Sequence, residues 1–195
     1  MSAEELVLAM KGPADWEKWL SKHHDSVSAV LLIIAKKGGP KSITYAEALD
    51  GALTWGWIDS QKRALDEKAF LQRFSPRKAK SPWSKINCAK AEALIAAEKM
   101  QAPGLAEVER ARKDGRWDRA YSGARTSEVP AELAAALSKN ARALAFFERL
   151  DSANRYAILF RVQTAVKPET RLARIEKFVS MCARHETVHP VVRKK

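Results

Sequence analysis

The residue types best suited to binding chemistry gather in one basic stretch, FSPRKAKSPWSKIN, residues 74–87. Residues 68–91 contain seven lysine or arginine residues and no acidic residue, in a chain whose net charge is +12. Prolines restrict the backbone of this stretch, Ser81 and Pro82 predict a helix start, and Trp83 offers an aromatic face. These features predict an anion site, because arginine makes paired hydrogen bonds to phosphate or carboxylate and a helix N-terminus adds backbone N–H groups.

The candidate ligand-binding residues come from this stretch and from the β-hairpin predicted before it. They are the polar, cationic and aromatic side chains that a hairpin and its adjoining loop would present to one ligand: Trp57, Asp59, Gln61, Lys62, Arg73, Arg77, Trp83 and Lys85. Three cations on one flank of the last predicted helix form a secondary basic flank: Lys167, Arg171 and Arg174. A tertiary ion pair would account for that flank equally well.

Three kinds of function fit this pattern. The favoured one is a non-enzymatic protein that binds nucleic acid, with a base stacked on Trp83, or a small anionic ligand. The second is an enzyme on a small anionic substrate, with Asp59 as base and Lys62 or Arg73 as electrophile, although the sequence contains no evident activated pair. In the third, the basic stretch only joins two domains or contacts a protein partner.

A zinc motif also occurs by pattern. HETVH, residues 185–189, matches H-E-x-x-H, in which both histidines lie on one helical face and a further ligand completes the site. Pro190 follows directly and disfavours helix at His189. We therefore expect neither a metal nor a cofactor.

The composition favours a globular protein, with 46% hydrophobic and 30% charged residues. No apolar run approaches the roughly 20 residues of a membrane helix. The first residues include acids in place of a basic signal segment, so we expect a cytoplasmic protein. Cys88 and Cys182 form no CxxC pair and are expected to be buried thiols.

Hydrophobic periodicity predicts an α+β fold: a small N-terminal α+β unit of helix, strand, helix and β-hairpin, followed by a mostly helical part. The run 29–35 predicts a buried strand, and Thr44 with Glu47 predicts a capping box for a helix that ends at Gly56. Residues 57–63 and 69–74 predict the hairpin. Helix starts are predicted at Pro13, Ser81-Pro82, Pro103, Pro130, Ser152 and Pro168.

The expected domain order follows from these elements. An α+β domain at residues 1–80 is followed by a helical hairpin packed on it at 81–115 and an aperiodic linker at 116–129. A helical domain at 130–190 and a basic tail at 191–195 complete the chain.

Several motifs resemble the YdeI/OmpD-associated (OmdA, bacteriocin-protection) family along essentially the whole chain: GWIDSQKR, RFSPR, SPWSKIN and KPETRLARI. The resemblance implies an α+β part followed by a helical domain, and a role in resistance to bacteriocins or antimicrobial peptides. Some descriptions of the family imply a periplasmic location. The resemblance supplies no catalytic residues, and family members usually carry glycine at the position of His185, which argues further against zinc.

Overall fold

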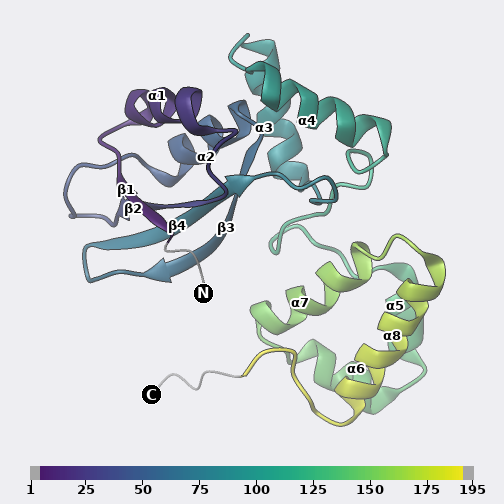
Figure 1. Ribbon diagram of the computed structural model, residues 1–195. Coiled ribbons are helices and arrows are strands. Elements are labelled where there is room, and N and C mark those ends of the chain that lie inside the picture. Colours follow the sequence, from purple (N-terminus) through teal and green to yellow (C-terminus); the bar gives the residue numbers. More distant parts are fainter. Residues whose placement is uncertain (1–4, 191–195) are drawn as a thin grey trace. The chain divides into compact units, whose positions relative to one another are not determined.

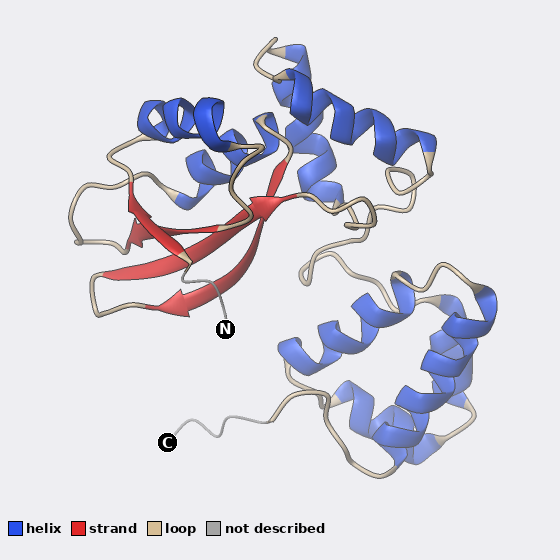
Figure 2. Ribbon diagram, viewed as in Figure 1, coloured by secondary structure: helices blue, strands red, loops and turns tan. Residues whose placement is uncertain are grey.

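A computed structural model describes residues 5–190 of the chain (Figure 1). Within this range there are four strands and eight helices, and the strands all precede the last six helices (Figure 2). The chain divides into two compact units, the first up to Trp83 with Asn87–Asp118, the second Ser84–Ile86 with the part from Arg119 onward. The predicted fold class, α+β followed by a helical part, is confirmed. The predicted basic tail at 191–195 lies outside the described residues.

The first unit is built on a four-stranded sheet in the order β1-β2-β4-β3. The strands are β1 (Leu6–Ala9), β2 (Val30–Ala35), β3 (Trp57–Ala64) and β4 (Ala69–Pro76). β1 pairs parallel to β2, and the other pairs are antiparallel. The predicted hairpin is thus present. Strand β1 was not predicted, because this short edge strand is largely exposed and shows no alternation of apolar and polar residues.

Helices α1 (Pro13–His23) and α2 (Tyr45–Thr54) cover one face of this sheet (Figure 1). The predicted capping box is present, because the Thr44 side chain accepts from the Glu47 N–H and the Glu47 carboxylate accepts from the Thr44 N–H. Gly56 ends the segment with φ +73°, as predicted. The core between helices and sheet consists of Met10, Trp16, Leu20, Val30, Leu32, Ile34, Ile43, Ala48, Ala52, Trp57 and Phe74.

Two further helices follow the sheet, α3 (Lys85–Ala96) and α4 (Ala102–Lys113). The predicted helix start at Ser81-Pro82 is wrong, because residues 78–81 close a turn instead. The Ser81 N–H donates to the Lys78 carbonyl (2.8 Å), and the Ser81 hydroxyl accepts from the Lys78 N–H (3.0 Å). The helix N-terminus expected at Pro82 is therefore not available to an anion there.

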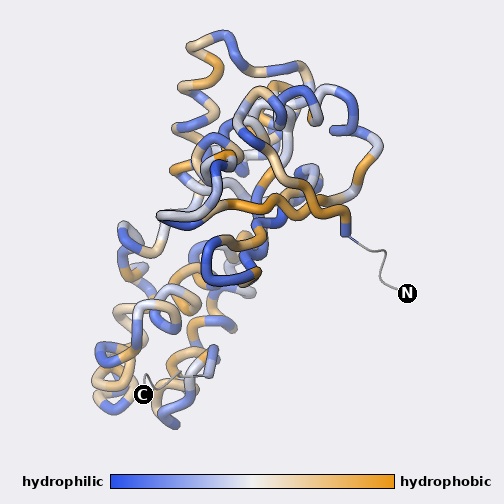
Figure 3. The backbone as a smooth tube through the Cα atoms, turned by 90° about the vertical axis from the view of Figure 1, so that its left-hand side faces the viewer, coloured by the Kyte–Doolittle hydropathy of each residue, from blue (hydrophilic) through white to orange (hydrophobic). Residues whose placement is uncertain are grey.

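The second unit consists of α5 (Ala131–Ser138), α6 (Ala141–Glu148), α7 (Ser152–Gln163) and α8 (Pro168–Ala183). Hydrophobic and hydrophilic residues alternate along these helices, as amphipathic helices require (Figure 3). Their buried faces form a second core: Leu133, Leu137, Ala143, Phe147, Ile158, Leu159, Val162, Ile175, Phe178 and Cys182. None of the described helices is both long enough and apolar enough to cross a membrane.

Some details of the helical part differ from the predictions. The N-cap of α7 is Asp151, whose carboxylate accepts from the Asn154 N–H (2.7 Å), so Ser152 is the first helical residue and not the cap. Ile86 and Leu172 stand at helical spacing with buried apolar residues, yet both are 57% exposed. Both cysteines are buried and free, as expected.

Candidate anion site

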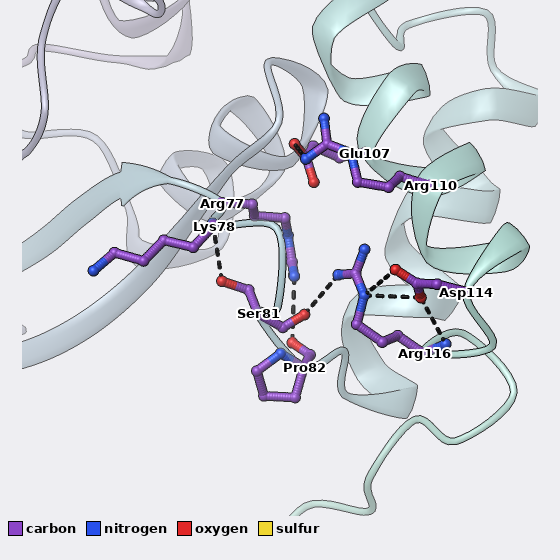
Figure 4. Close-up of polar contacts among 8 residues, drawn as sticks. All are labelled: Arg77, Lys78, Ser81, Pro82, Glu107, Arg110, Asp114 and Arg116. Atoms are coloured by element: carbon purple, nitrogen blue, oxygen red, sulfur yellow. Dashed lines mark hydrogen bonds and ion pairs between the residues drawn. The ribbon is translucent and has the colours of Figure 1, made fainter. Parts of the chain in front are cut away.

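The basic stretch leaves the end of β4 and folds against α4 (Figure 4). Arg77 begins this path with two hydrogen bonds: its backbone N–H donates to the Gly56 carbonyl (2.9 Å), and its Nη1 donates to the Pro82 carbonyl (3.3 Å). Although charged, Arg77 is only 6% exposed. We refer to Arg77, Trp83, Glu107 and Arg116 as the arginine cluster.

Two indoles, flanked by one guanidinium group on each side, form a continuous stack in this region. The guanidinium carbon of Arg77 lies 3.5 Å from the ring centroid of Trp83. The rings of Trp83 and Trp117 follow at 4.9 Å, and the guanidinium carbon of Arg112 lies 5.0 Å from the Trp117 ring. Such cation–π contacts gain strength when they are removed from water. The stack therefore fixes the basic stretch on α4.

Arg116 enters the same region from the turn that follows α4. Its Nη1 donates to the Ser81 carbonyl (2.8 Å), next to the Pro82 carbonyl that binds Arg77. Its Nε donates to both oxygens of Asp114, at 2.9 and 2.8 Å, so this carboxylate orients the guanidinium (Figure 4). The side chain of Arg116 is 12% exposed.

The hydrogen bonding of the cluster is incomplete. Nε1 of Trp83, Nη2 of Arg116 and Oε2 of Glu107 are buried and have no hydrogen-bond partner among residues 5–190. Trp83 as a whole is 2% exposed and Glu107 8% exposed. Buried polar atoms in folded proteins almost always have a partner. The unmatched N–H groups of Trp83 and Arg116 are therefore suited to donate hydrogen bonds to an added anion.

The thiol of Cys88 lies within electrostatic reach of this cluster. Burial raises the pKa of Cys88 to about 11, and the charge of Arg77 acts weakly in the opposite direction. At neutral pH the side chain is therefore a protonated thiol and not a nucleophilic thiolate.

With this geometry established, the comparisons with known families can be set beside it. Residues 8–107, which are 100 of the 195 residues, match the family model described as Domain of unknown function (DUF8412). The chain belongs to the DUF8412 family. This match includes strands β2, β3 and β4 and the second half of β1. Arg77, Trp83 and Glu107 lie within it, whereas Arg116 lies beyond it.

Residues 126–185 match a second family model, described as Bacteriocin-protection, YdeI or OmpD-Associated (OmdA). This match confirms the OmdA resemblance for the four helices of the second unit, which include the motif KPETRLARI. The motifs GWIDSQKR, RFSPR and SPWSKIN lie in the DUF8412 match instead. No curated protein and no solved structure matches the chain.

Within the DUF8412 region, the structure does not bring the hairpin candidates to one place. Asp59 pairs with Phe74 across the sheet and Lys62 with Gln72, so both lie on the opposite face from Arg73. Asp59 accepts from the Tyr45 hydroxyl (2.7 Å), and the Lys62 ammonium lies 3.8 Å from the Phe70 ring centroid. The base and the Arg73 electrophile of the enzyme hypothesis thus have separate surroundings.

Arg73 belongs instead to an ion-pair cluster on the other face of the sheet. The Glu5 carboxylate accepts from Nε of Arg73 and contacts Nη1 of Arg63 at 3.0 Å. Gln61 adjoins them, because its side-chain oxygen accepts from Nη2 of Arg63 (2.9 Å). The hydrogen bond from Arg73 lowers the pKa of Glu5 below its ordinary value.

The remaining candidates of the basic stretch and hairpin differ in exposure. Trp57 is 1% exposed, and its Nε1 donates to the His24 carbonyl (3.0 Å), so its ring belongs to the core. Trp83 is equally inaccessible and adjoins Arg77, as described above. Lys85 is exposed at the first residue of α3. Of the eight predicted ligand residues, the structure brings only Arg77 and Trp83 together within the arginine cluster.

The secondary basic flank lies in the OmdA region at α8. Arg171 contacts the Glu132 carboxylate at 2.7 Å, so a tertiary ion pair accounts for this cation. Arg174 donates from Nη1 to the Arg161 carbonyl, and Lys167 is the N-cap residue of the helix. This flank packs α8 against its neighbours.

The zinc motif does not lie on a helix. α8 ends at Ala183, and His185 has a left-handed φ of +59°. The His185 N–H donates to the Cys182 carbonyl and the Glu186 N–H to the Met181 carbonyl, which is the Schellman arrangement at a helix end. Glycine is favoured in this conformation, which gives a physical reason for the glycine that the family resemblance implies at this position. His185 occupies it with its ring stacked 4.9 Å from that of Phe146.

Glu107 and Arg116 were absent from the candidates predicted from sequence. Both lie in or just after a charged amphipathic helix, where solvated charges are ordinary. In the sequence, only Arg116 has neighbours that could have indicated a role, because it stands beside Trp117 and two residues after Asp114. Their burial depends on the path of residues 77–83, which periodicity does not reveal.

Proposed function

We propose that this chain is a non-enzymatic protein that binds a small anion, such as phosphate, at the arginine cluster. The observation that carries the proposal is the pair of buried donors, Trp83 Nε1 and Arg116 Nη2, that have no partner among residues 5–190. Hydrogen bonds from ionised donors are about twice as strong as neutral ones. Nη2 of Arg116 is such a donor, and Nε and Nη1 of the same guanidinium hold it in place through Asp114 and Ser81. Arg77 adds a second buried positive charge.

The surroundings of the cluster support a small ligand more than a nucleic acid base. Both neighbours of Trp83, the Arg77 guanidinium and the Trp117 ring, already contact its indole, which leaves little ring surface for stacking. Lys78 and Lys80 are exposed in the adjoining turn. Exposed cations of this kind raise the local concentration of an anion without contacting it directly.

The proposal is tested by calorimetric titration of inorganic phosphate at constant ionic strength. Wild-type protein is expected to bind one phosphate saturably. Arg116→Gln should weaken binding roughly 10- to 100-fold, which corresponds to the loss of one charge-assisted hydrogen bond of about 1.5–3 kcal/mol. Lys113→Gln removes the same charge from the last turn of α4 and should bind like wild type.

Two further measurements keep this test decisive. Arg116→Lys retains the charge but not the guanidinium fork, so it should bind more weakly than wild type even if Arg116→Gln unfolds. Circular dichroism identifies a variant that has lost its fold. A wild-type protein without saturable binding, or an Arg116→Lys variant that binds as well as wild type, would refute the proposal.

Nucleic acid binding is the second candidate, and the exposed cations Lys78, Lys80 and Lys85 favour it. Each contacted phosphate contributes about 0.7–0.9 to the slope of log K against log salt. Replacing Lys78 and Lys80 by Gln should therefore flatten the slope by about 1.4–1.8 if they contact nucleic acid. An unchanged slope would exclude this candidate for these residues.

At the level of the cell, we propose a part in resistance to bacteriocins or antimicrobial peptides, exercised in the cytoplasm. The description of the OmdA family supports the first point. The two free, buried cysteines are compatible with a reducing compartment. Deleting the gene should increase sensitivity to such peptides, and the wild-type gene but not the Arg116→Lys variant should restore resistance. If the wild-type gene and the Arg116→Lys variant both restore resistance, then resistance does not depend on anion binding at this cluster.

A further inference from the structure

Besides its donors, the arginine cluster contains a buried acceptor that the binding of a simple anion does not use. Oε1 of Glu107 contacts Nη1 of Arg110 at 2.9 Å. The second carboxylate oxygen, Oε2, is buried and has no hydrogen-bond partner among residues 5–190. The side chain of Glu107 is 11% exposed, whereas that of Arg110 is 47% exposed, so the ion pair is open to solvent from the arginine side.

The side chain of Glu107 and the backbone of Arg77 both adjoin Gly56. A β-carbon placed on Gly56 would lie 3.1 Å from Cγ of Glu107 and 2.9 Å from the Pro103 carbonyl oxygen. The Gly56 carbonyl itself accepts from the Arg77 N–H (2.9 Å). Glycine with φ +73° thus permits α4 and the start of the basic stretch to approach closely, and Figure 4 shows Glu107 on the α4 side of Arg77.

An ionised carboxylate only accepts hydrogen bonds, so its buried oxygen requires a donor. A fully deprotonated oxyanion brings no donor and adds repulsion between like charges. An oxyanion that keeps a proton brings one O–H group for Glu107 and oxygen acceptors for the N–H groups of Trp83 and Arg116. At neutral pH inorganic phosphate keeps at least one proton, whereas sulfate, of similar shape and charge, keeps none.

We infer that the ligand of the arginine cluster is a protonated tetrahedral oxyanion of the phosphate class, and that Glu107 selects it against sulfate. This inference rests on the proposed anion-binding function. Glu107 acts as the acceptor of the ligand's O–H group, while Trp83 and Arg116 donate to its other oxygens. The selection follows from hydrogen-bond polarity and not from size.

The same chemistry separates two sources of phosphate. A phosphomonoester loses its last ionisable proton near pH 6, so its dianion offers no O–H to Glu107. Inorganic phosphate retains one proton far above that pH. The binding of a phosphomonoester should therefore weaken as the pH rises from about 5.5 to 8, while that of inorganic phosphate persists.

The test compares phosphate and sulfate by calorimetry on the wild-type chain, on Glu107→Gln and on Glu109→Gln, which removes an exposed carboxylate from the same helix. Wild type and Glu109→Gln should bind phosphate at least about tenfold more tightly than sulfate. Glutamine can donate through its amide, so Glu107→Gln should bring the ratio close to one. The wild-type comparison and the phosphomonoester titration between pH 5.5 and 8 do not depend on the folding of any variant.

Each result bears on one of the two ideas. Equal binding of phosphate and sulfate by wild type would overturn the role of Glu107 but leave anion binding intact. Failure of both anions to bind would overturn the proposed function and this inference with it. A ratio that persists in Glu107→Gln would assign the selection to another group.

Discussion

Arg63 and Arg73 on the open face of the sheet contrast with Arg77 and Arg116 in the arginine cluster. The former pair shares the carboxylate of Glu5, which accepts from both guanidinium groups. Arg116 also contacts a carboxylate, that of Asp114, yet its buried Nη2 has no partner within residues 5–190. The side chains of Arg63 and Arg73 are 46% and 27% exposed, whereas that of Arg116 is 12% exposed.

This difference shows that a high density of lysine and arginine residues in the sequence does not by itself indicate where an anion would bind. An anion near Arg73 must compete with Glu5 and with water, in which ion pairs between exposed groups are worth little. An anion near Arg116 would satisfy donors that are already removed from water, where the same charge interacts more strongly. Hydrogen-bond accounting therefore distinguishes two regions that look alike in sequence.

The largest expected effect comes from removing the indole that Arg77 and Trp117 contact. Trp83→Ala should lower the free energy of unfolding of the first unit by about 3–5 kcal/mol, because it leaves a cavity where a fully buried aromatic ring stood. Urea denaturation monitored by circular dichroism measures the loss. Trp83→Phe retains most of the apolar contact and should cost well under half as much. A loss below about 1 kcal/mol in Trp83→Ala would contradict the buried stack.

A smaller effect, dependent on pH, is expected at Glu5. The pKa of Glu5 is lower in the folded chain than its ordinary value of about 4.3. The ionised carboxylate therefore stabilises the fold fully at pH values above that ordinary pKa. That contribution is lost as the pH falls through the lowered pKa. The difference in urea midpoint between wild type and Glu5→Gln should therefore shrink between about pH 4.5 and 3.

The matched control for Glu5 is Glu67→Gln, which changes an exposed carboxylate in the hairpin turn. Its difference from wild type should show no comparable shrinkage in acid. A Glu5→Gln difference that stays constant, or grows, as the pH falls would show that Arg63 and Arg73 do not depend on Glu5.

The smallest effect is expected at the ion pair of Arg171 with Glu132. The two side chains are 31% and 56% exposed, so Arg171→Ala should lower the free energy of unfolding of the second unit by no more than about 1 kcal/mol. Added salt should reduce even this loss. A larger, salt-independent loss in urea denaturation would mean that the basic flank of α8 has a role beyond this surface pair.

Sequence patterns predicted correctly the helices and turns whose ends depend on neighbouring residues. They failed where contacts between residues far apart in the sequence determine the local structure. Thr44 with Glu47, Gly56 and Pro168 act within one turn of chain, so their roles follow from residue type. The helix start at Pro82 was wrong because the turn at 78–81 and the burial of Trp83 override a local preference.

The same limit applies to the site. The basic stretch predicted Arg77 and Trp83 as ligand residues, and the two lie in contact in the structure. Strand alternation, however, places Asp59 and Arg73 on opposite faces of the sheet. Arg116 and Arg77 donate to successive carbonyls, those of Ser81 and Pro82. No periodicity encodes that arrangement, because it depends on how an irregular loop lies against a helix.

The most direct measurement of the central claim observes the unmatched N–H of Trp83 itself. The chain has six tryptophans, so a ¹⁵N-labelled sample gives an indole N–H signal for each, and the signal that disappears in Trp83→Phe is that of Trp83. Titration with inorganic phosphate should shift this signal strongly and saturably, and should shift it far less in Arg116→Lys. A Trp83 signal that stays in place while phosphate is added, or that moves identically in both proteins, would contradict an anion site at the arginine cluster.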